Sequence, residues 1–557
     1  MLRSIRVGLV LLIALAVALF FFAWHSPLLS PAGRLRGFDS DAAIIGLMGR
    51  KLLEGRGFDI FFWGQNYLGP LTSMFAAAVG AFTGGVGPLA LRLGAMTEIF
   101  AGIVLMGLGV GRIDRRAGVA TMVALAVTPP VLVQMIVVPL GAEMAFFMTA
   151  ALFAAFMHRP HPLLLGVLAG IGWWMNQQVV FTLMAGAIVL ALRSPFVRNA
   201  LQNVRVRDRW HFRGDALRWR RVPGVVHAAA WITTRIGALL FVAFVVCDLA
   251  GVRIVPFVFG RAIDALILLI APLLLMPLAF GEWRHWRMPP RAELAPAAVF
   301  ACGFLLGYAP VWLGWILGWY ERTYVFTFRL NYPSEIAAQL HSFRGIAAHW
   351  TGAPSHALAA LVFVLAFGAL LITALRPKRE DARLLLALVP LLNVAFYMLA
   401  AGTKPHYLTA SVGMLFGLAA VGLIELYETR RVAASICALI VVAALAASTK
   451  RMHHQVLSEP DPLPLLARVR SANCAVTYAD FWIAYRYRLL DEERGAWIPY
   501  RSQNRTKSES IAAQRLPGQR CLVENDGTIV KLDRDLPLVH TPPRRGARVN
   551  PPARPSV

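Results

Sequence analysis

Long runs of apolar residues, separated by short polar stretches, repeat along most of this chain. A helix needs about 20 consecutive apolar residues to cross a bilayer, and thirteen runs approach that length. We therefore predict an all-α polytopic membrane protein with about thirteen transmembrane helices. The predicted spans are 7–24, 88–110, 117–137, 141–157, 162–176, 178–192, 236–256, 262–281, 295–318, 355–375, 384–400, 407–425 and 432–447.

Two apolar segments do not fit a simple count of spans. Leu68–Thr83 has only about 16 residues, many of them small, so we predict a helix lying along the outer interface. The stretch 162–192 has about 30 residues, which is too long for one span. We therefore divide it into a hairpin whose polar tip, Asn176-Gln177-Gln178, lies outside.

The basic residues lie mainly in loops between apolar segments, which is the positive-inside pattern. The stretch 193–235 alone contains ten Arg and only two Asp. With the N-terminus in the cytoplasm, all the main basic loops fall on the cytoplasmic side: 111–116, 158–161, 193–235, 284–291, 376–379 and 430–431. The same parity makes 25–87 the first outer loop and places the residues after 447 outside.

Composition agrees with this class of protein. Of the 557 residues, 58% are apolar and 15% are charged, as expected for a membrane domain with a modest soluble part. A net charge of +25 on a soluble protein would suggest nucleic-acid binding. Here the positive-inside pattern explains the charge, so no nucleic-acid partner is predicted.

The chain changes character after residue 447. Alternating short strands and helices predict a small α/β domain over 448–534, and the proline- and arginine-rich tail 535–557 is predicted to be disordered. The predicted elements are the strands Cys474–Tyr478, Ala496–Tyr500 and Cys521–Glu524 and the helix Asp480–Leu490. The membrane domain therefore covers 1–447.

Cysteine usage supports an outer position for this domain. Cys474 and Cys521 each begin a predicted strand, and parallel neighbouring strands would bring them together. We therefore predict a disulfide formed in an oxidising compartment. Cys247, Cys302 and Cys437 lie in apolar spans and are predicted to be core thiols.

Polar residues of mixed type collect on the predicted outer face. Asp39 and Asp41 follow the first span directly, where carboxylates are costly and indicate function. The alternative is a solvated loop in which Asp39 is the N-cap of a helix over Ala42–Leu53. Acids, amides, aromatics and bases gathered at a membrane surface suggest chemistry on a lipid-linked polar substrate.

With this arrangement the chain resembles the C-type glycosyltransferase superfamily, membrane enzymes that use polyprenyl-phosphate sugars. Within it, the likeness is to bacterial relatives of protein O-mannosyltransferases and of the lipid A aminoarabinose transferase. The motifs that carry it are the acid pair Asp39-Ser40-Asp41 with Gly64-Gln65-Asn66-Tyr67, the acidic second outer loop with Glu143, the glycine-rich hairpin Gly166–Gln177, and Lys404-Pro405-His406-Tyr407-Leu408. The segment Tyr478–Arg486 also looks like the outer domain of bacterial members.

The resemblance implies transfer of a sugar from polyprenyl phosphate to an extracytoplasmic acceptor, with inversion, at the bacterial inner membrane. Asp41 or Asp39 would be the general base. The departing phosphate needs cationic donors, for which the candidates are Lys404, His406, Arg322 and Arg329. The candidates for binding the sugar or acceptor are Gln65, Asn66, Tyr67, Trp173, Asn176 and Tyr407.

Simpler roles compete with each of these. The arginines would also suit contact with lipid headgroups, and Trp173 would suit interfacial anchoring. His406 replaces an Arg of many relatives, and Asn176 lies where relatives often have Lys, which leaves the phosphate ligands and the sugar open.

A metal ion is a further possibility. Glu143 together with Asp39 or Asp41 would suit a divalent cation such as Mg²⁺ or Mn²⁺, although Glu143 also fits an N-cap or first-turn acid of the fourth span. Glu98 lies inside the second span with no partner at helical spacing. The alternatives from other classes are a transporter of lipid-linked glycans and a non-catalytic scaffold for envelope assembly.

Overall fold

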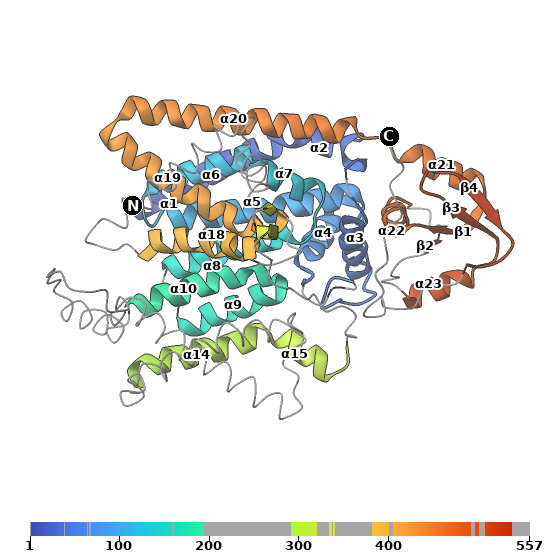
Figure 1. Ribbon diagram of the computed structural model, residues 1–557, viewed down its shortest axis with the longest axis horizontal. Coiled ribbons are helices and arrows are strands. Elements are labelled where there is room, and N and C mark those ends of the chain that lie inside the picture. Colours follow the sequence, from blue (N-terminus) through green and yellow to red (C-terminus); the bar gives the residue numbers. More distant parts are fainter. Residues whose placement is uncertain are drawn as a thin grey trace.

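The computed structural model describes most of the helical part and most of the C-terminal region (Figure 1). The described residues are 2–37, 39–63, 65, 68–158, 161–193, 291–319, 334–336, 338–339, 381–399, 405–491, 496–500 and 507–536. The predicted spans 236–256, 262–281 and 355–375 lie outside them, as do nearly all of the loop 193–235 and of the tail 535–557.

The helices form an elongated bundle, and a small α/β unit lies at one end of it (Figure 1). The α-helices of the bundle are α1 (Leu2–Trp24), α2 (Ser26–Leu29), α3 (Ser40–Leu53), α4 (Leu71–Thr83), α5 (Pro88–Val110), α6 (Arg115–Val127), α7 (Pro130–Val137), α8 (Ala142–His158), α9 (Pro162–Met175), α10 (Val180–Arg193), α14 (Arg291–Gly307), α15 (Ala309–Ile316), α18 (Asp381–Leu399), α19 (Val412–Thr429) and α20 (Arg431–Ser458). Short 3-10 turns are η1 (Gly33–Leu35), η2 (Gln177–Val179) and η4 (Pro405–Ser411).

By length and composition, three helical segments among the described residues are able to cross a bilayer: Pro88–Val110, His406–Thr429 and Arg431–Ser471. A fourth is added if the bent pair α6 and α7 forms one span. Other predicted spans coincide with shorter apolar helices such as α8, which has 17 residues where a perpendicular crossing takes about 20. The chain is thus a mostly helical membrane protein, and the count of thirteen spans stays a prediction.

Both unusual apolar segments behave locally as predicted. The segment expected along the interface forms α4, a helix of 13 residues that is too short to cross a bilayer. The stretch 162–192 breaks at Asn176 and η2 into α9 and α10, which confirms the predicted break, and the outer position of this tip stays a prediction.

The predicted span 117–137 is bent by 53° between α6 and α7. Pro129 and Pro130 cause the break, because proline lacks the N–H that a continuous helix requires. Thr128 adopts a left-handed conformation there, with φ at 71°. The hydroxyl of Thr449 on α20 lies 3.0 and 2.7 Å from the carbonyl oxygens of Val127 and Thr128 and has one hydrogen to donate to them. A side chain of another helix thus offers a partner to backbone oxygen that the break frees, as an apolar environment demands.

The backbones of helices α9 and α14 lie in close contact where the two helices cross, because glycines occupy the crossing. Gly166 and Gly170 of α9 face Gly303 and Gly307 of α14, and a Cβ at any of the four would clash with a backbone carbonyl oxygen of the other helix. Pairs of glycines four residues apart let two helix backbones approach closely, which increases their van der Waals contact in a bilayer. This contact attaches α14 to the rest of the bundle.

The C-terminal unit is a four-stranded sheet of order β2-β1-β3-β4, in which β1 runs parallel to β2 and β3, and β4 is antiparallel to β3. Its elements are α21 (Leu463–Ser471), β1 (Cys474–Ala479), α22 (Phe481–Leu490), β2 (Ala496–Pro499), α23 (Lys507–Gln514), β3 (Gln519–Val523) and β4 (Ile529–Leu532). The three predicted strands and the helix are confirmed. The sequence analysis missed β4, an edge strand without buried residues, and α20 extends past the predicted boundary at 447 to Ser458.

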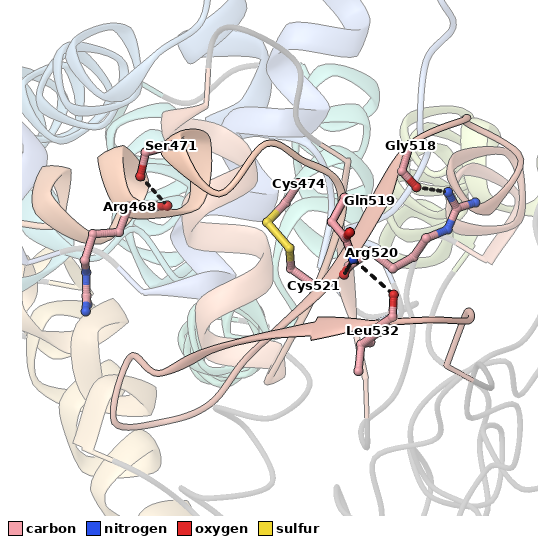
Figure 2. The surroundings of a disulfide bond; sticks show 8 residues. All are labelled: Arg468, Ser471, Cys474, Gly518, Gln519, Arg520, Cys521 and Leu532. Carbon is pink, nitrogen blue, oxygen red and sulfur yellow. Dashed lines mark hydrogen bonds between the residues drawn. A yellow bond between two sulfur atoms is a disulfide. The ribbon is translucent and has the colours of Figure 1, made fainter.

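The predicted disulfide is present between Cys474 and Cys521, whose Cα atoms lie 5.8 Å apart on the parallel strands β1 and β3 (Figure 2). The bridge closes a loop of 47 residues in sequence. In the chain-entropy description, closing such a loop stabilises the folded domain by about 4 kcal/mol. Cys302 and Cys437 are free, but Cys302 is exposed and Cys437 is half-buried, so the prediction of core thiols is wrong for Cys302. Cys247 lies outside the described residues.

The close contact between α9 and α14 can be tested with Gly→Ala, which we expect to change the free energy of unfolding in opposite directions at two positions. Gly170→Ala adds a Cβ that meets Phe304 of α14, so we expect the free energy of unfolding to fall by about 1–3 kcal/mol. Gly186 lies inside α10, and no atom lies within 4 Å of the place that a Cβ would occupy there. Gly186→Ala is expected to stabilise by about 0.5–1 kcal/mol, because alanine loses less backbone entropy. Thermal melting of the detergent-solubilised variants measures both; equal effects would contradict the close crossing.

Candidate functional site

Three of the predicted outer segments meet at one end of the bundle. Leu68, just before α4, forms a β-bridge with Asn176 at the hairpin tip, and the Gly69 N–H donates to the carbonyl of Met175 at 2.9 Å. The side-chain amide of Asn176 donates to the carbonyl of Gly141 in the second outer loop at 2.8 Å. The predicted convergence of these loops on one face is confirmed by direct contacts.

The fourth outer segment, η4, joins the same end. It packs against α8 and η2, next to the hairpin tip. Within it, the His406 and Tyr407 rings lie 4.6 Å apart, and the hydroxyl of Thr409 donates to the His406 carbonyl at 2.7 Å. Both rings are half-buried, so the two described candidates for contact with the donor phosphate and sugar are held in a compact turn.

The acid pair stands at the first turn of α3. Asp39 is the N-cap, and its Oδ1 accepts the Ala42 N–H at 3.0 Å, so the capping interpretation is correct for this residue. The cap is made through Oδ1 of the carboxylate. Burial, aided by the charge of Asp41 and opposed by the Ala42 N–H, raises the pKa of Asp39 to about 6. A carboxyl with that pKa is a stronger base than an ordinary aspartate and is still charged at neutral pH.

The C-terminal α/β unit, predicted to be the outer domain, packs directly onto this helix. The Ser40 hydroxyl donates to the carbonyl of Phe481 at 2.7 Å, and the Arg50 guanidinium donates to the carbonyls of Leu489 and Val86 at 3.0 and 3.1 Å. One hydrophobic cluster contains residues of α3 and of α22 together. The N-terminal ends of α3 and α22 are therefore neighbours, and the acid pair lies beside the start of α22 (Figure 1).

A buried arginine holds the segment that leads to the acid pair. Arg92 of α5 is 1% exposed and donates to the carbonyls of Leu28 and Arg36. Arg36 in turn donates to the carbonyl of Leu457 near the end of α20. Hydrogen bonds to α5 and α20 therefore hold in place the segment that leads to the acid pair. Nothing in the sequence analysis singled out Arg92, although an arginine inside an apolar run is itself a signal of function.

Glu143 has other partners than a metal ion. Its carboxylate accepts the N–H groups of Leu140 and Gly141 at 3.3 and 3.0 Å and lies 2.8 Å from the Thr72 hydroxyl. Thr72 also lies 2.7 Å from Glu98, the acid for which the sequence offered no partner. All three side chains are at most 1% exposed. The alternative interpretation of Glu143, a first-turn acid of α8, therefore fits the structure.

The contacts of Thr72 with Glu98 and Glu143 determine how many protons the two carboxyl groups carry. A threonine hydroxyl has one hydrogen to donate, so it cannot donate to both carboxylates. The second short contact requires a carboxyl O–H that donates to Thr72. One of Glu98 and Glu143 is therefore protonated, and two like charges are not buried side by side. The second oxygen of Glu98 makes no hydrogen bond with any described residue.

The described residues do not form a ready metal site. They contain no group of three or more His, Cys, Asp or Glu side chains able to hold an ion together. Glu143 is enclosed with Glu98 and Thr72, so the predicted pairing of Glu143 with Asp39 around a cation has no support in these contacts. The possible divalent cation stays a prediction, and no step of the reaction proposed for this site depends on it.

The remaining predicted residues divide into three groups. Asn176 is 3% exposed and uses its amide on Gly141 and Gln178, so it positions the hairpin tip; its contact with a sugar stays a prediction. Trp173 lies edge-on against Phe304 of α14, and Gln65 forms a tight turn with Phe62. The predicted residues outside the described part are Asn66, Tyr67, Arg322, Arg329 and Lys404.

Comparison with known proteins gives a likeness of fold. No protein family description matches the chain, and no curated protein is similar to it in sequence. An Archaeoglobus fulgidus oligosaccharyltransferase, AglB, in complex with an inhibitory peptide and a dolichol-phosphate, has 12% identity and a TM-score of 0.47 over 96% of this chain and 75% of its own. Another structure of that organism's oligosaccharyltransferase, tethered to an acceptor peptide, gives 13% and 0.44 over 82% of this chain; the chain spans only 56% of its length.

ArnT from Cupriavidus metallidurans in the apo state has 12% identity and a TM-score of 0.46, over 94% of this chain and 93% of its own. These TM-scores are all below 0.5, so no argument about this chain rests on the likenesses, and the activity has to be inferred from its own residues.

The bridge between the two glutamates can be tested at Thr72. Thr72→Val keeps the shape of the side chain but removes the hydroxyl, which leaves two buried carboxyls without their common partner. We expect the free energy of unfolding to fall by about 1–3 kcal/mol. Thr72→Ser keeps the hydroxyl and is expected to retain most of the stability. Thermal melting in detergent distinguishes the two; a stable Thr72→Val protein would show that the bridge is dispensable.

Proposed function

We propose that this chain transfers a sugar from a polyprenyl-phosphate donor to a hydroxyl of an extracytoplasmic acceptor, at the bacterial inner membrane and with inversion. The acceptor oxygen attacks the anomeric carbon while a carboxylate of the acid pair takes its proton. The bond from that carbon to the phosphate oxygen breaks, and polyprenyl phosphate leaves. The acceptor is a hydroxyl on an envelope glycan, lipid or protein.

The observation that carries this proposal is the position of the acid pair. Asp39 and Asp41 start a buried helix at the end of the bundle where four polar segments meet, beside a disulfide-bonded domain. A lipid-linked donor reaches this end from the bilayer, and a polar acceptor reaches it from the water. Both substrates need to meet a base there, and the raised pKa of Asp39 suits that role.

The leaving phosphate requires positive charge or hydrogen-bond donors close to the acid pair. His406 and Tyr407 on η4 are the described candidates at this end, and Lys404, Arg322 and Arg329 are the predicted ones. In the proposed reaction these groups stabilise the charge that develops on the phosphate as the bond to the sugar lengthens. The acceptor approaches from the side of α22, whose Trp482 is 55% exposed.

Asparagine substitutions separate a base from a cap at Asp39. Asn caps helices as well as Asp does, so Asp39→Asn keeps α3 capped while removing the carboxylate. We expect Asp39→Asn or Asp41→Asn to lower kcat/KM by about 100- to 10,000-fold, the usual contribution of a general base. The readout is release of undecaprenyl phosphate from purified protein supplied with undecaprenyl-phosphate sugars. Glu54→Gln at the other end of α3 is the matched control. Full activity in both asparagine variants would refute the base assignment.

The pH dependence distinguishes the two acids. A base acts in its charged form, so if Asp39 is the base, kcat/KM rises with pH, is half-maximal near pH 6 and levels off above it. The negative charge of Asp41 contributes to the raised pKa of Asp39. In that case Asp41→Asn is expected to keep measurable activity and to move the midpoint to lower pH. Loss of activity in Asp41→Asn, with activity retained in Asp39→Asn, would assign the base to Asp41.

A further inference from the structure

A groove of about 550 Å³ lies between α6, α19 and α20, among helices that do not contribute to the acid pair. Its walls are almost wholly apolar, and small residues shape them: Ala120 and Ala124 on α6, Ala419 and Ala420 on α19, and Ala438 on α20. The volume falls within the range of about 300–1,000 Å³ that is typical of small-molecule sites. The groove therefore has the size and chemistry to hold a hydrocarbon chain.

Positive charge lies at one end of this groove. Arg115 and Arg116, the first residues of α6, line it and are exposed. Arg116 also pairs with Asp114 and with Glu428 at the end of α19, 3.2 and 2.6 Å away, which fixes that guanidinium near the mouth and leaves Arg115 as the lining arginine outside these pairs. Arg430 and Arg431 follow at the start of α20. All four arginines belong to basic loops that the positive-inside pattern places in the cytoplasm.

We propose that this groove binds an anionic phospholipid of the cytoplasmic leaflet. One acyl chain occupies the alanine-lined channel, and the headgroup phosphate lies at Arg115 and Arg116. Charge complementarity selects this occupant, because a neutral lipid or an apolar helix would gain nothing from arginines at the mouth. The groove opens among spans at the end opposite the acid pair, so this inference is independent of the proposed transferase activity.

Native mass spectrometry of the detergent-purified full chain tests the proposal, with phosphatidylglycerol and phosphatidylcholine of identical chains as probes. We expect one phosphatidylglycerol to be retained per chain. Each cationic side chain near a membrane surface favours an anionic lipid by about 1 kcal/mol, so two arginines give roughly a thirtyfold preference. Arg115→Ala, which leaves the Arg116–Glu428 pair intact, is expected to lower that preference roughly fivefold.

Two further variants test the channel. Ala438→Phe fills the groove and is expected to abolish retention of the lipid, whereas Leu439→Phe, on a residue 71% exposed and outside the groove, leaves it unchanged. Arg112→Ala is the matched charge control, because Arg112 precedes the same helix but contacts His158 instead of the groove. Melting temperatures equal to wild type establish that each variant is folded.

Three results would overturn the proposal. The first is equal retention of phosphatidylglycerol and phosphatidylcholine, and the second is a preference that survives both Arg115→Ala and Arg116→Ala. The third is a dimer of the chain that Ala438→Phe abolishes, because this would make a second copy the occupant. Because transferase activity is not measured, these outcomes are separate from those that test the acid pair.

Discussion

The end of the bundle that carries the acid pair depends on the hydroxyl of Thr72, which joins two buried glutamates on different helices. Through it α4 is tied to α5 at Glu98 and to α8 at Glu143. The Glu143 carboxylate accepts the N–H of Gly141. The carbonyl of Gly141 in turn accepts a hydrogen bond from the side-chain amide of Asn176 at the hairpin tip. A single protonated carboxyl allows this chain of bonds to exist in an apolar interior, since two charged glutamates would repel and desolvate each other.

The acid pair is held from both sides by this framework. Helix α4 packs against α3, which carries Asp39 and Asp41, and α22 of the outer domain covers the other side of α3. The bonds from Ser40 and Arg50 to backbone carbonyls of the outer domain and its shared apolar core make that domain part of the site. The acid pair, the helix that carries it and the domain beside it are therefore held together by direct contacts, which suits the positioning of two substrates in the proposed reaction.

The two ends of the bundle differ in chemistry. At the outer end, polar side chains bond mainly to backbone groups and hold loops in place. At the other end, arginines lie at the surface in ion pairs such as Arg116–Glu428, next to an apolar groove. Surface ion pairs of this kind contribute little stability, so their arginines are suited to interaction with lipid phosphates.

Local sequence pattern was sufficient to predict the helical class, the hairpin break at Asn176, three strands of the outer domain and the disulfide. These features follow from apolar length, polar interruption, alternation and the position of cysteines in neighbouring strands. The pattern offered an N-cap and a base as competing interpretations of Asp39, and the cap is confirmed, because capping depends on residues within one turn. The roles of Glu98 and Glu143 became visible in the folded chain alone, since their shared partner Thr72 lies 26 and 71 residues away along the chain. Contacts between helices that are distant in sequence, such as α4, α5 and α8, depend on how the helices pack together, and the local sequence pattern of one helix does not specify that packing.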